Sequence, residues 1–562
     1  MHMLIVIFWI GNEDPITKDF WLVPTQHPGA YAYEQHPSVK VVYTHHVEEN
    51  TGSEACRALM RKWVEYCVKH DPCPLPTEDT VQLPTRVIDV GHHGDTQMHL
   101  HITKDSDVQH GRYMTLSHRW GKVNLPKCTK SKLGELQKGF DVSALPTTFR
   151  DAIEVTRSFG IRFLWIDSLC ILQDSAEDWV QEAGMMGDVY HDCFVNIAAT
   201  AAQDSDGDLW NFEIELAVVN TRGWVAQERL FSPRILHFGS NQLWWKCTAR
   251  AACEMSPGGD PDFSAGPQLR PWKHLADCFS ASEPTPISEM TKLQRYRRWR
   301  AWWDFVEAYT TRDFTFTSDK LIAVSAVAKA MIRQHAAGNE EYLAGLWRWW
   351  LELDLYWLVF YDKDITSSKK TFRPNPDDTW RAPSWSWASV DGPVWRSSIG
   401  PNGDAASLIR ILSTGVAPLH GSGRTGLLKA ASLTIECRIF HADWVLSPLS
   451  DSSRDGDRIE SANGNRIITG SLNFDNLNLA SAMTGSGRTR VACMPGAYIF
   501  DSSGDLTRKD FVHGLVLESV PNTVHQFRRT GQFFVNTGVD DLYKFVGEER
   551  LEDMGVTKIV LL

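Results

Sequence analysis

The chain has 562 residues, a formal net charge of -12 and a hydrophobic fraction of 43%, a length that allows roughly three or four domains with sizeable cores. The acidic balance excludes a global positive field that would hold nucleic acid or an anionic membrane, so proteins or small molecules are the expected partners. Eleven cysteines without a compact framework indicate reduced thiols and a cytoplasmic location.

Residues 1–84 are predicted to be an N-terminal extension that holds one helix, from Glu54 to Lys69. The apolar start MHMLIVIFWIGNE lacks a basic leader and a clear cleavage site, so no secretion signal is expected, and no apolar run reaches the ~18 residues of a membrane span. The motif Cys67-x-x-His70-x-x-Cys73 has zinc-ligand residue types, and His92 or His93 could complete the set. Because the spacing matches no standard zinc motif, ordinary thiols at a helix end are preferred and no metal is predicted.

Residues 85–255 are predicted to form an α/β domain. Strand-like stretches at Thr85–Val90, Met98–Ile102 and Tyr113–Ser117 precede a helix from Thr147 to Phe159, and this alternation is typical of α/β folds. The central strand is expected from Phe163 to Ile171. Its run is apolar except for three residues near its carboxyl end (Asp167, Ser168 and Cys170), which is where loops of open α/β sheets build ligand sites.

A helix is expected directly after the central strand. Asp174 and Ser175 supply helix-start chemistry, and apolar residues follow at helical spacing (Trp179, Ala183, Met186, Val189 and Tyr190). Phe194 to Ala199 is predicted as the next strand and Arg222 to Leu230 as a helix. The last predicted element is a hairpin of Arg234–Phe238 and Gln242–Cys247 that closes the sheet edge.

The remaining sequence divides into three parts. Residues 256–288 are rich in Pro, Gly and Ser and indicate a loop or linker, 289–395 a helical region that ends in the PSWSWAS segment, and 396–562 a β-rich region. The run RYRRWRAWW at 295–303 could touch single-stranded nucleic acid, but a helix with Trp inward and Arg outward is preferred. Gly421 to Gly426 matches a dinucleotide fingerprint, yet a strand follows it, so the match is attributed to chance.

Three long motifs of this chain occur together in a known order. They are YMTLSHRWG at Tyr113 to Gly121, LPTTFRDAIEVTRSFGIRFLWIDSLCILQD at Leu145 to Asp174, and RGWVAQERLFSPRILHFGSNQLWWKC at Arg222 to Cys247. In sequence and order they resemble the signature block of the fungal heterokaryon incompatibility (HET) domain, closely over residues 86–255 and more loosely to Val394. The resemblance implies a fungal cytoplasmic protein that triggers programmed cell death after fusion with a non-self partner, through protein partners or self-association.

The HET domain has itself been likened to Toll/interleukin-1 receptor (TIR) domains, some of which hydrolyse NAD with a glutamate on the helix after a central strand. This likeness implies a TIR-like or flavodoxin-like, mainly parallel sheet, NAD as a substrate with no resident cofactor, and Glu182 as the catalytic residue. The chain has Trp179-x-x-Glu182, one residue shorter than the Trp-x-x-x-Glu pattern of catalytic TIR domains.

The acidic residues around the central strand are the first set of candidates. Carboxylates of Asp167, Asp174, Glu182 and Glu228 can stabilise the cationic transition state of glycosidic cleavage. Helix capping, a solvated helix position and pairing with a nearby arginine are the structural alternatives for these side chains. Asp167 is kept beside Glu182 as a catalytic candidate, and Asp174 as a substrate-binding one.

Other polar residues give further candidates. Cys170 is a third catalytic candidate, as a nucleophile with His118 or His191 as base, although a buried thiol can be simple packing. Ser117, His118 and Asp167 supply the residue types of a hydrolase triad without a nucleophile elbow around Ser117. Ser117, Arg119 and Trp120 are the other substrate-binding candidates, because Arg119 could bind a phosphate or carboxylate as readily as form a structural salt bridge.

Two other interpretations of function stay open. The domain could be a signalling or interaction module without catalysis, in which association alone conveys the signal. It could also be an inactive relative, since the connection from Ala202 to Arg222 is shorter than is usual in the family. A mispredicted gene model would give the same short connection.

Overall fold

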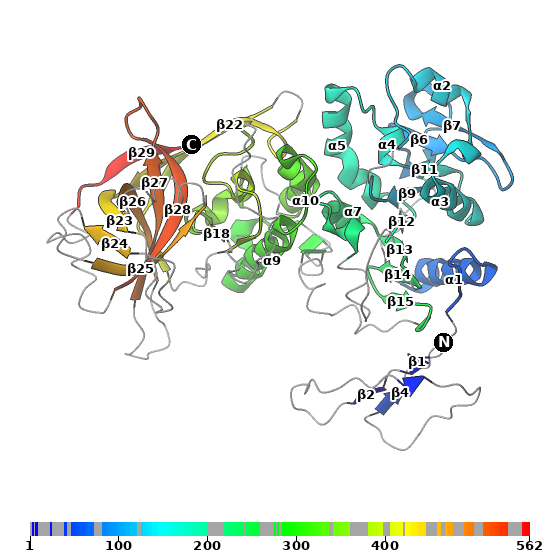
Figure 1. The fold of residues 1–562 in the computed structure, drawn as a ribbon, viewed down its shortest axis with the longest axis horizontal. Coiled ribbons are helices and arrows are strands. Elements are labelled where there is room, and N and C mark those ends of the chain that lie inside the picture. Colours follow the sequence, from blue (N-terminus) through cyan, green and yellow to red (C-terminus); the bar gives the residue numbers. More distant parts are fainter. Residues whose placement is uncertain are drawn as a thin grey trace. The chain divides into compact units, whose positions relative to one another are not determined.

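A computed structural model of the chain describes residues 47–71, 73, 81–120, 125–200, 217–240, 242–258, 275–276, 278–279, 284–335, 341–359, 380–396, 405–419, 422–445, 458–461, 467–475, 488–499, 510–537 and 554–562, together with four short strands before residue 42. The chain divides into two compact units, Met1–Arg270 and Pro271–Leu562 (Figure 1). The four early strands pair as β1 (Met3–Leu4) with β3 (Val23–Pro24) and β2 (Val6–Phe8) with β4 (Val39–Val41).

A nine-stranded sheet forms the centre of the first unit. Its strands lie in the order β10 (Phe140–Asp141), β7 (Gln97–Ile102), β6 (Arg86–Asp89), β11 (Phe163–Trp165), β9 (Tyr113–Ser117), β12 (Asn196–Ala198), β13 (Arg234–Phe238), β14 (Leu243–Cys247) and β15 (Ala251–Cys253). The pairs from β11 to β13 are parallel and the outer pairs are antiparallel. The α/β class is confirmed, but the sheet is mixed and not mainly parallel, because hairpins extend both edges.

Helices cover both faces of this sheet. Figure 1 shows α5 (Ala176–His191) and α7 (Val225–Phe231) on one side of the strands and α1 (Glu54–His70) and α3 (Thr147–Ser158) on the other. Side chains alternate between the two faces along a strand. The Tyr113 hydroxyl accordingly donates to the Val189 carbonyl of α5 at 2.7 Å. Other small elements of this unit include α2 (Leu133–Lys138), β5 (Val81–Gln82) and β8 (His110–Gly111).

Three details differ from the expectations. The central strand ends at Trp165, and Asp167–Cys170 form the single turn α4, which Asp167 stabilises by accepting from the Ser168 N–H at 2.7 Å. A short apolar run does not distinguish a strand from a buried helical turn. Ser175 is the N-cap of α5, whereas Asp174 accepts from the Lys130 N–H. The β13–β14 hairpin is confirmed, but β15 lies outside it.

The second unit begins with a tryptophan-rich helical part. Its elements are α9 (Lys292–Thr310), α10 (Ser325–Gln334), β16 (Tyr342–Leu343), β17 (Leu346–Trp347), α11 (Leu351–Asp354), β18 (Leu358–Val359) and β19 (Val394–Trp395). In α9 the tryptophans Trp299, Trp302 and Trp303 are buried while Arg295 and Arg297 are exposed, so the inward-Trp, outward-Arg prediction is confirmed. The β16–β17 hairpin separates α10 from α11 within this part.

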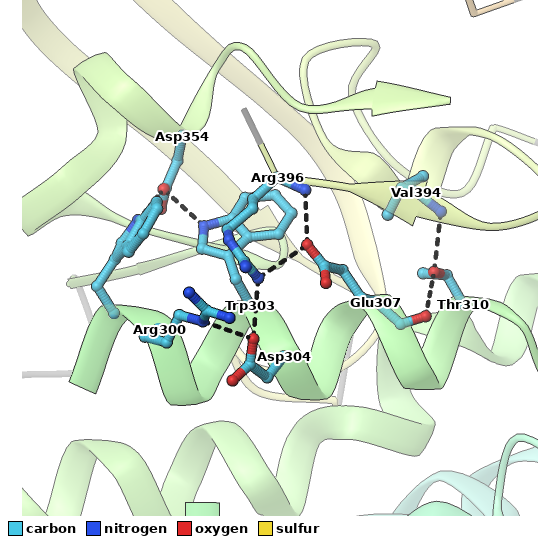
Figure 2. Close-up of polar contacts among 9 residues, drawn as sticks. Arg300, Trp303, Asp304, Glu307, Thr310, Asp354, Val394 and Arg396 are labelled. Atoms are coloured by element: carbon cyan, nitrogen blue, oxygen red, sulfur yellow. Dashed lines mark hydrogen bonds and ion pairs between the residues drawn. The ribbon is translucent and has the colours of Figure 1, made fainter. Parts of the chain in front are cut away.

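Polar contacts attach this helix to the segment that follows PSWSWAS (Figure 2). The Arg396 guanidinium bridges Asp304 at 2.9 Å and Glu307 at 3.0 Å, and the Val394 N–H donates to the Thr310 hydroxyl at 3.0 Å. The indole N–H of Trp303 donates to Asp354 at 2.8 Å. Burial disfavours the ionised form and raises the pKa of the Asp354 carboxyl to about 7, whereas the hydrogen bond from Trp303 stabilises the ionised form and opposes that rise.

The rest of the second unit is β-rich, as predicted. The strands are β20 (Ala405–Ser407), β21 (Arg410–Pro418), β22 (Leu428–Cys437), β23 (Phe440–Val445), β24 (Arg458–Ser461), β25 (Ile467–Phe474), β26 (Arg488–Ile499), β27 (Asp510–Ser519), β28 (Gln526–Thr537) and β29 (Thr557–Leu561). Residues 422–426 connect the antiparallel strands β21 and β22, and Gly421 lies outside the described residues. The glycine-rich run is therefore followed by a strand, which is not the context of a dinucleotide fingerprint. Within the described ranges, every helix is too short or too polar to cross a membrane.

Candidate functional site

Polar side chains gather on the α5 and α7 face of the sheet, near the carboxyl ends of the parallel strands. Asn196 of β12 lies opposite Thr115 of β9 in parallel register, and its carbonyl oxygen accepts from the Thr115 hydroxyl at 3.1 Å. Its amide nitrogen donates to the Ser117 Oγ at 3.0 Å. All three side chains are buried. The strand pairing thus fixes the position of Ser117 at the last residue of β9.

Glu228 of α7 completes this buried group. The Ser117 hydroxyl donates to its Oε2 at 2.5 Å, and Glu228 is 4% exposed. Loss of hydration raises the pKa of Glu228 to about 7; the nearby Arg222 charge and the Ser117 hydrogen bond oppose this rise, and the Asp167 charge adds to it. Arg222 is held in place by donating to the His118 carbonyl. A carboxyl with a pKa near neutrality can exchange a proton at physiological pH.

His118 faces the other side of the sheet from Ser117. Its ring meets Phe149 of α3 edge-on at 5.0 Å, and its Nδ1 lies 3.9 Å from an Asp167 oxygen. Burial lowers the pKa of His118, so the ring is neutral at pH 7. Among the described residues neither ring nitrogen has a hydrogen-bond partner. Consecutive residues of an extended chain point to opposite faces of the sheet, and the Ser117 hydroxyl donates to Glu228. The structure therefore does not assemble a triad of Ser117, His118 and Asp167.

Asp167, Trp120 and Arg119 form the accessible rim of this group. The Trp120 indole N–H donates to the Asp167 Oδ2 at 2.7 Å, and the Asp167 side chain is 19% exposed. Arg119 is exposed, and Trp120 is half-buried. Gly121, the end of the first motif, lies outside the described residues. Four of the sequence-predicted candidates (Ser117, Arg119, Trp120 and Asp167) therefore come from this one region.

Glu182 and Cys170 belong to a different cluster, around Arg86 of β6. Arg86 lies 2.6 Å from an Asp178 oxygen and 3.5 Å from a Glu182 oxygen, and its Nε donates to the Cys170 carbonyl at 2.6 Å. The Glu182 side chain is 1% exposed, and burial raises its pKa while the Arg86 charge opposes that rise. These contacts hold α5 and α4 against β6.

The other predicted residues have ordinary surroundings. Cys170 is fully buried, and burial raises the pKa of its thiol far above the usual range, which disfavours a thiolate nucleophile. His191 is bonded to Asp192 at the exposed end of α5. Asp174 is exposed and accepts from the Lys130 N–H at 2.9 Å, so it holds the preceding loop. The catalytic and binding roles of all these residues stay predictions.

A comparison with protein-family models gives one match. Residues 113–215 match the heterokaryon incompatibility protein (HET) model, in agreement with the resemblance drawn from the three motifs. Residues 113–215 of this chain are therefore similar to a HET domain. No match was found among curated proteins or among solved structures.

The matched part of the HET domain begins at β9 and includes β11, α5 and β12. Ser117 and Asp167 lie within it, whereas Glu228 comes from a later helix that folds back onto β9. The connection 201–216 lies outside the described residues. A match to the HET domain suggests a heterokaryon incompatibility protein.

Sequence reasoning missed Asn196 and named Arg222 only as one of three arginines, with Arg229 and Arg234, that could pair with Glu228. Asn196 is a polar residue inside the otherwise apolar strand VNIAA, and a buried amide on a central strand indicates a specific hydrogen-bonding role. The local sequence does not single Arg222 out from the other two arginines; the fold does, because Arg222 donates to the His118 carbonyl and its charge acts on Glu228. Glu228 was considered only as one of four acidic residues, and its local sequence gives no sign that it meets Ser117.

Proposed function

We propose that the HET domain of this chain is an effector of programmed cell death in heterokaryon incompatibility, acting in the cytoplasm of a fungal cell after fusion with a non-self partner. The match of residues 113–215 to the HET family model supports this role. The parallel centre of the sheet, with helices on both faces, supports a remote relation to TIR-like folds. The proposed chemistry is hydrolysis of NAD at the bond between nicotinamide and ribose, with NAD as substrate.

The observation that carries this chemistry is the buried Glu228 beside the strand ends. Cleavage of the glycosidic bond releases neutral nicotinamide with the bonding electron pair and leaves positive charge on the ribose, to which water then adds. A carboxylate in a water-poor site stabilises that charge more strongly than one in water. Its pKa of about 7 also allows it to accept the proton of the attacking water.

The rim residues supply the contacts that a dinucleotide needs. The exposed guanidinium of Arg119 suits a pyrophosphate, and the half-buried Trp120 presents an aromatic ring to a planar base. Asp167, held by the Trp120 indole at 2.7 Å, positions the substrate next to Ser117. We assign these residues to binding and Glu228 to the reacting centre.

Glu182 has a different role in this proposal. The TIR likeness selects it, but its carboxylate is paired with Arg86 between α5 and β6. If the Glu182 carboxylate turned to a substrate, the buried positive charge of Arg86 would lose part of its neutralising partner, which is costly in a low-dielectric interior. We therefore assign Glu182 to holding α5 on the sheet, and this assignment is separable from Glu228 by mutation.

The test measures NAD content and viability together in fungal cells induced to express the full chain or its variants. Glu228→Gln is expected to prevent both NAD loss and death, and Glu135→Gln, an exposed carboxylate on α2, serves as the charge-matched control. If Glu182→Gln alone prevents NAD loss while its protein level is unchanged, the catalytic assignment reverts to Glu182. Death with NAD unchanged would favour the non-catalytic signalling module, and neither effect would favour an inactive relative.

A further inference from the structure

Four potential metal ligands come together where α1 meets the edge of the sheet. Single ligand atoms of Cys67, Asp71, Cys73 and Cys247 all lie within 4.8 Å of one another. The three cysteines are 1%, 6% and 6% exposed in that order along the chain, and the Asp71 side chain is 3% exposed. A buried cluster of this composition shares no residue with the proposed reaction site and needs its own explanation.

Local structure explains how the first three ligands meet. Cys67 lies in the last turn of α1, and Asp71 is its C-cap, with its N–H donating to the Cys67 carbonyl at 3.1 Å. At Asp71 the backbone becomes extended, so the chain leaves the helix axis and returns Cys73 to the same side. A helix end thus presents two sulfurs and one carboxylate within a seven-residue stretch.

The fourth ligand comes from a part of the sequence distant from the other three. Cys247 is the last residue of β14, and Trp63 of α1 stacks on Trp245 of that strand with ring centroids 6.5 Å apart. The turn after Cys247 is fixed by its N–H donating to the Arg250 carbonyl at 2.9 Å. This packing brings the Cys247 sulfur within 3.5 Å of the Asp71 Oδ2.

Neighbouring groups orient the ligands as the outer shell of a metal site does. The Arg250 guanidinium donates to both oxygens of Asp71, at 2.6 and 3.0 Å, and packs over the Tyr66 ring at 4.1 Å. The Thr248 hydroxyl donates to the Cys73 sulfur at 3.0 Å.

We propose that Cys67, Asp71, Cys73 and Cys247 bind one zinc ion. Three thiolates and a carboxylate give the four N, O or S ligands of a closed tetrahedral site, and thiolates select zinc over harder cations such as magnesium. A carboxylate has lone pairs for both the metal and Arg250, while Arg250 compensates part of the excess negative charge. The site would be structural, joining α1 to β14 across the domain.

The sequence spacing concealed this site. The motif Cys67-x-x-His70-x-x-Cys73 was set aside because no standard zinc motif has that spacing. In the structure the histidine is not a ligand: His70 is exposed and packs against Tyr66 at a centroid distance of 4.6 Å. Asp71 takes its place, and the remaining ligand is Cys247, which no local motif could supply.

The test is the metal content of the full chain, purified under reducing conditions without chelator and measured by inductively coupled plasma mass spectrometry. About one zinc per chain is expected, and replacement by Co(II) should give the intense d–d and sulfur-to-metal bands of tetrahedral thiolate coordination. Cys73→Ser should abolish these bands, and Asp71→Asn, which replaces a charged ligand by a neutral one, should weaken zinc binding. Cys128→Ser, a buried thiol of the same unit outside the cluster, should retain the zinc.

Two results would overturn the proposal. One is wild-type protein that takes up neither zinc nor cobalt after reconstitution in the reduced state. The other is a disulfide between two of the three cysteines in protein purified without reductant, found by peptide mapping, together with no uptake after its reduction. Because both measurements use the wild-type chain, they decide the question even if Cys73→Ser fails to fold.

Discussion

Replacing Glu228 by glutamine removes a carboxyl group that burial keeps partly protonated at neutral pH. Its pKa is raised from 4.5 to about 7, and at about 1.4 kcal/mol for each pKa unit this corresponds to roughly 3 kcal/mol. Glutamine has nearly the same shape and can still accept the Ser117 hydrogen bond, so the variant isolates the effect of ionisation.

The sign of the effect follows from proton binding. Between the unfolded pKa near 4.5 and the folded pKa near 7, the folded state binds more protons than the unfolded state, so the free energy of unfolding falls as pH rises. The stabilisation is fully present below the unfolded pKa and is lost as pH rises through the folded pKa. The glutamine variant lacks this loss, so its stability relative to wild type should increase by about 2.5 kcal/mol between pH 5 and pH 8.

The assay is differential scanning calorimetry or urea unfolding at pH 5 and pH 8, following the transition that belongs to residues 1–270, because two units need not unfold together. Infrared spectroscopy of the protonated carboxyl band gives a direct titration of Glu228 in the wild type, by difference from the variant. Glu135→Gln controls for the loss of one surface charge. A stability difference between wild type and Glu228→Gln that is the same at both pH values would refute the reasoning.

Two further substitutions test the packing of each unit. Arg86→Leu leaves Glu182 buried without its cation and should lower the free energy of unfolding by about 3–5 kcal/mol. The double variant with Glu182→Leu should recover much of that loss. A cost of Arg86→Leu below about 1 kcal/mol in urea titration would contradict a buried ion pair. Gly345→Ala should destabilise the second unit by about 2–4 kcal/mol, since φ is +96° and the new Cβ would lie 2.7 Å from the Trp387 Nε1. Gly423→Ala is the matched control, because φ is also positive (+67°) but the Cβ would face open space. The thermal midpoint should therefore fall less in Gly423→Ala than in Gly345→Ala. Equal shifts in the two variants would show that the Trp387 contact does not cause the destabilisation.

Much of the fold of the first unit could be predicted from local patterns. The strands at Tyr113–Ser117 and Arg234–Phe238 and the helix before Phe163 have the expected bounds within a residue or two, because hydrophobic periodicity and turn residues act over short stretches. The central strand was predicted too long, since Ile166 and Leu169 are as apolar as the strand before them. Burial in a helical turn and burial in a strand leave the same local signal.

The candidate site shows where local reasoning stops. Ser117 and His118 have the residue types of a triad, but the two-residue period of an extended chain directs them to opposite faces of the sheet. Glu228 meets Ser117 only because α7 packs over the strand ends, 111 residues further along the chain. No spacing rule in the sequence encodes such a pair.

The sequence by itself indicated the likeness to the HET domain, because three long motifs in one order carry it without any knowledge of geometry, and residues 113–215 match that family model. Tertiary structure alone decided which side chains share a site. It brought Glu228 within hydrogen-bonding distance of Ser117, paired Glu182 with Arg86, and placed the free thiol of Cys247 near that of Cys67. The physical reason is that motifs record short-range order, whereas the chemistry of a site depends on distances between atoms. Those distances are set by sheet order and helix packing.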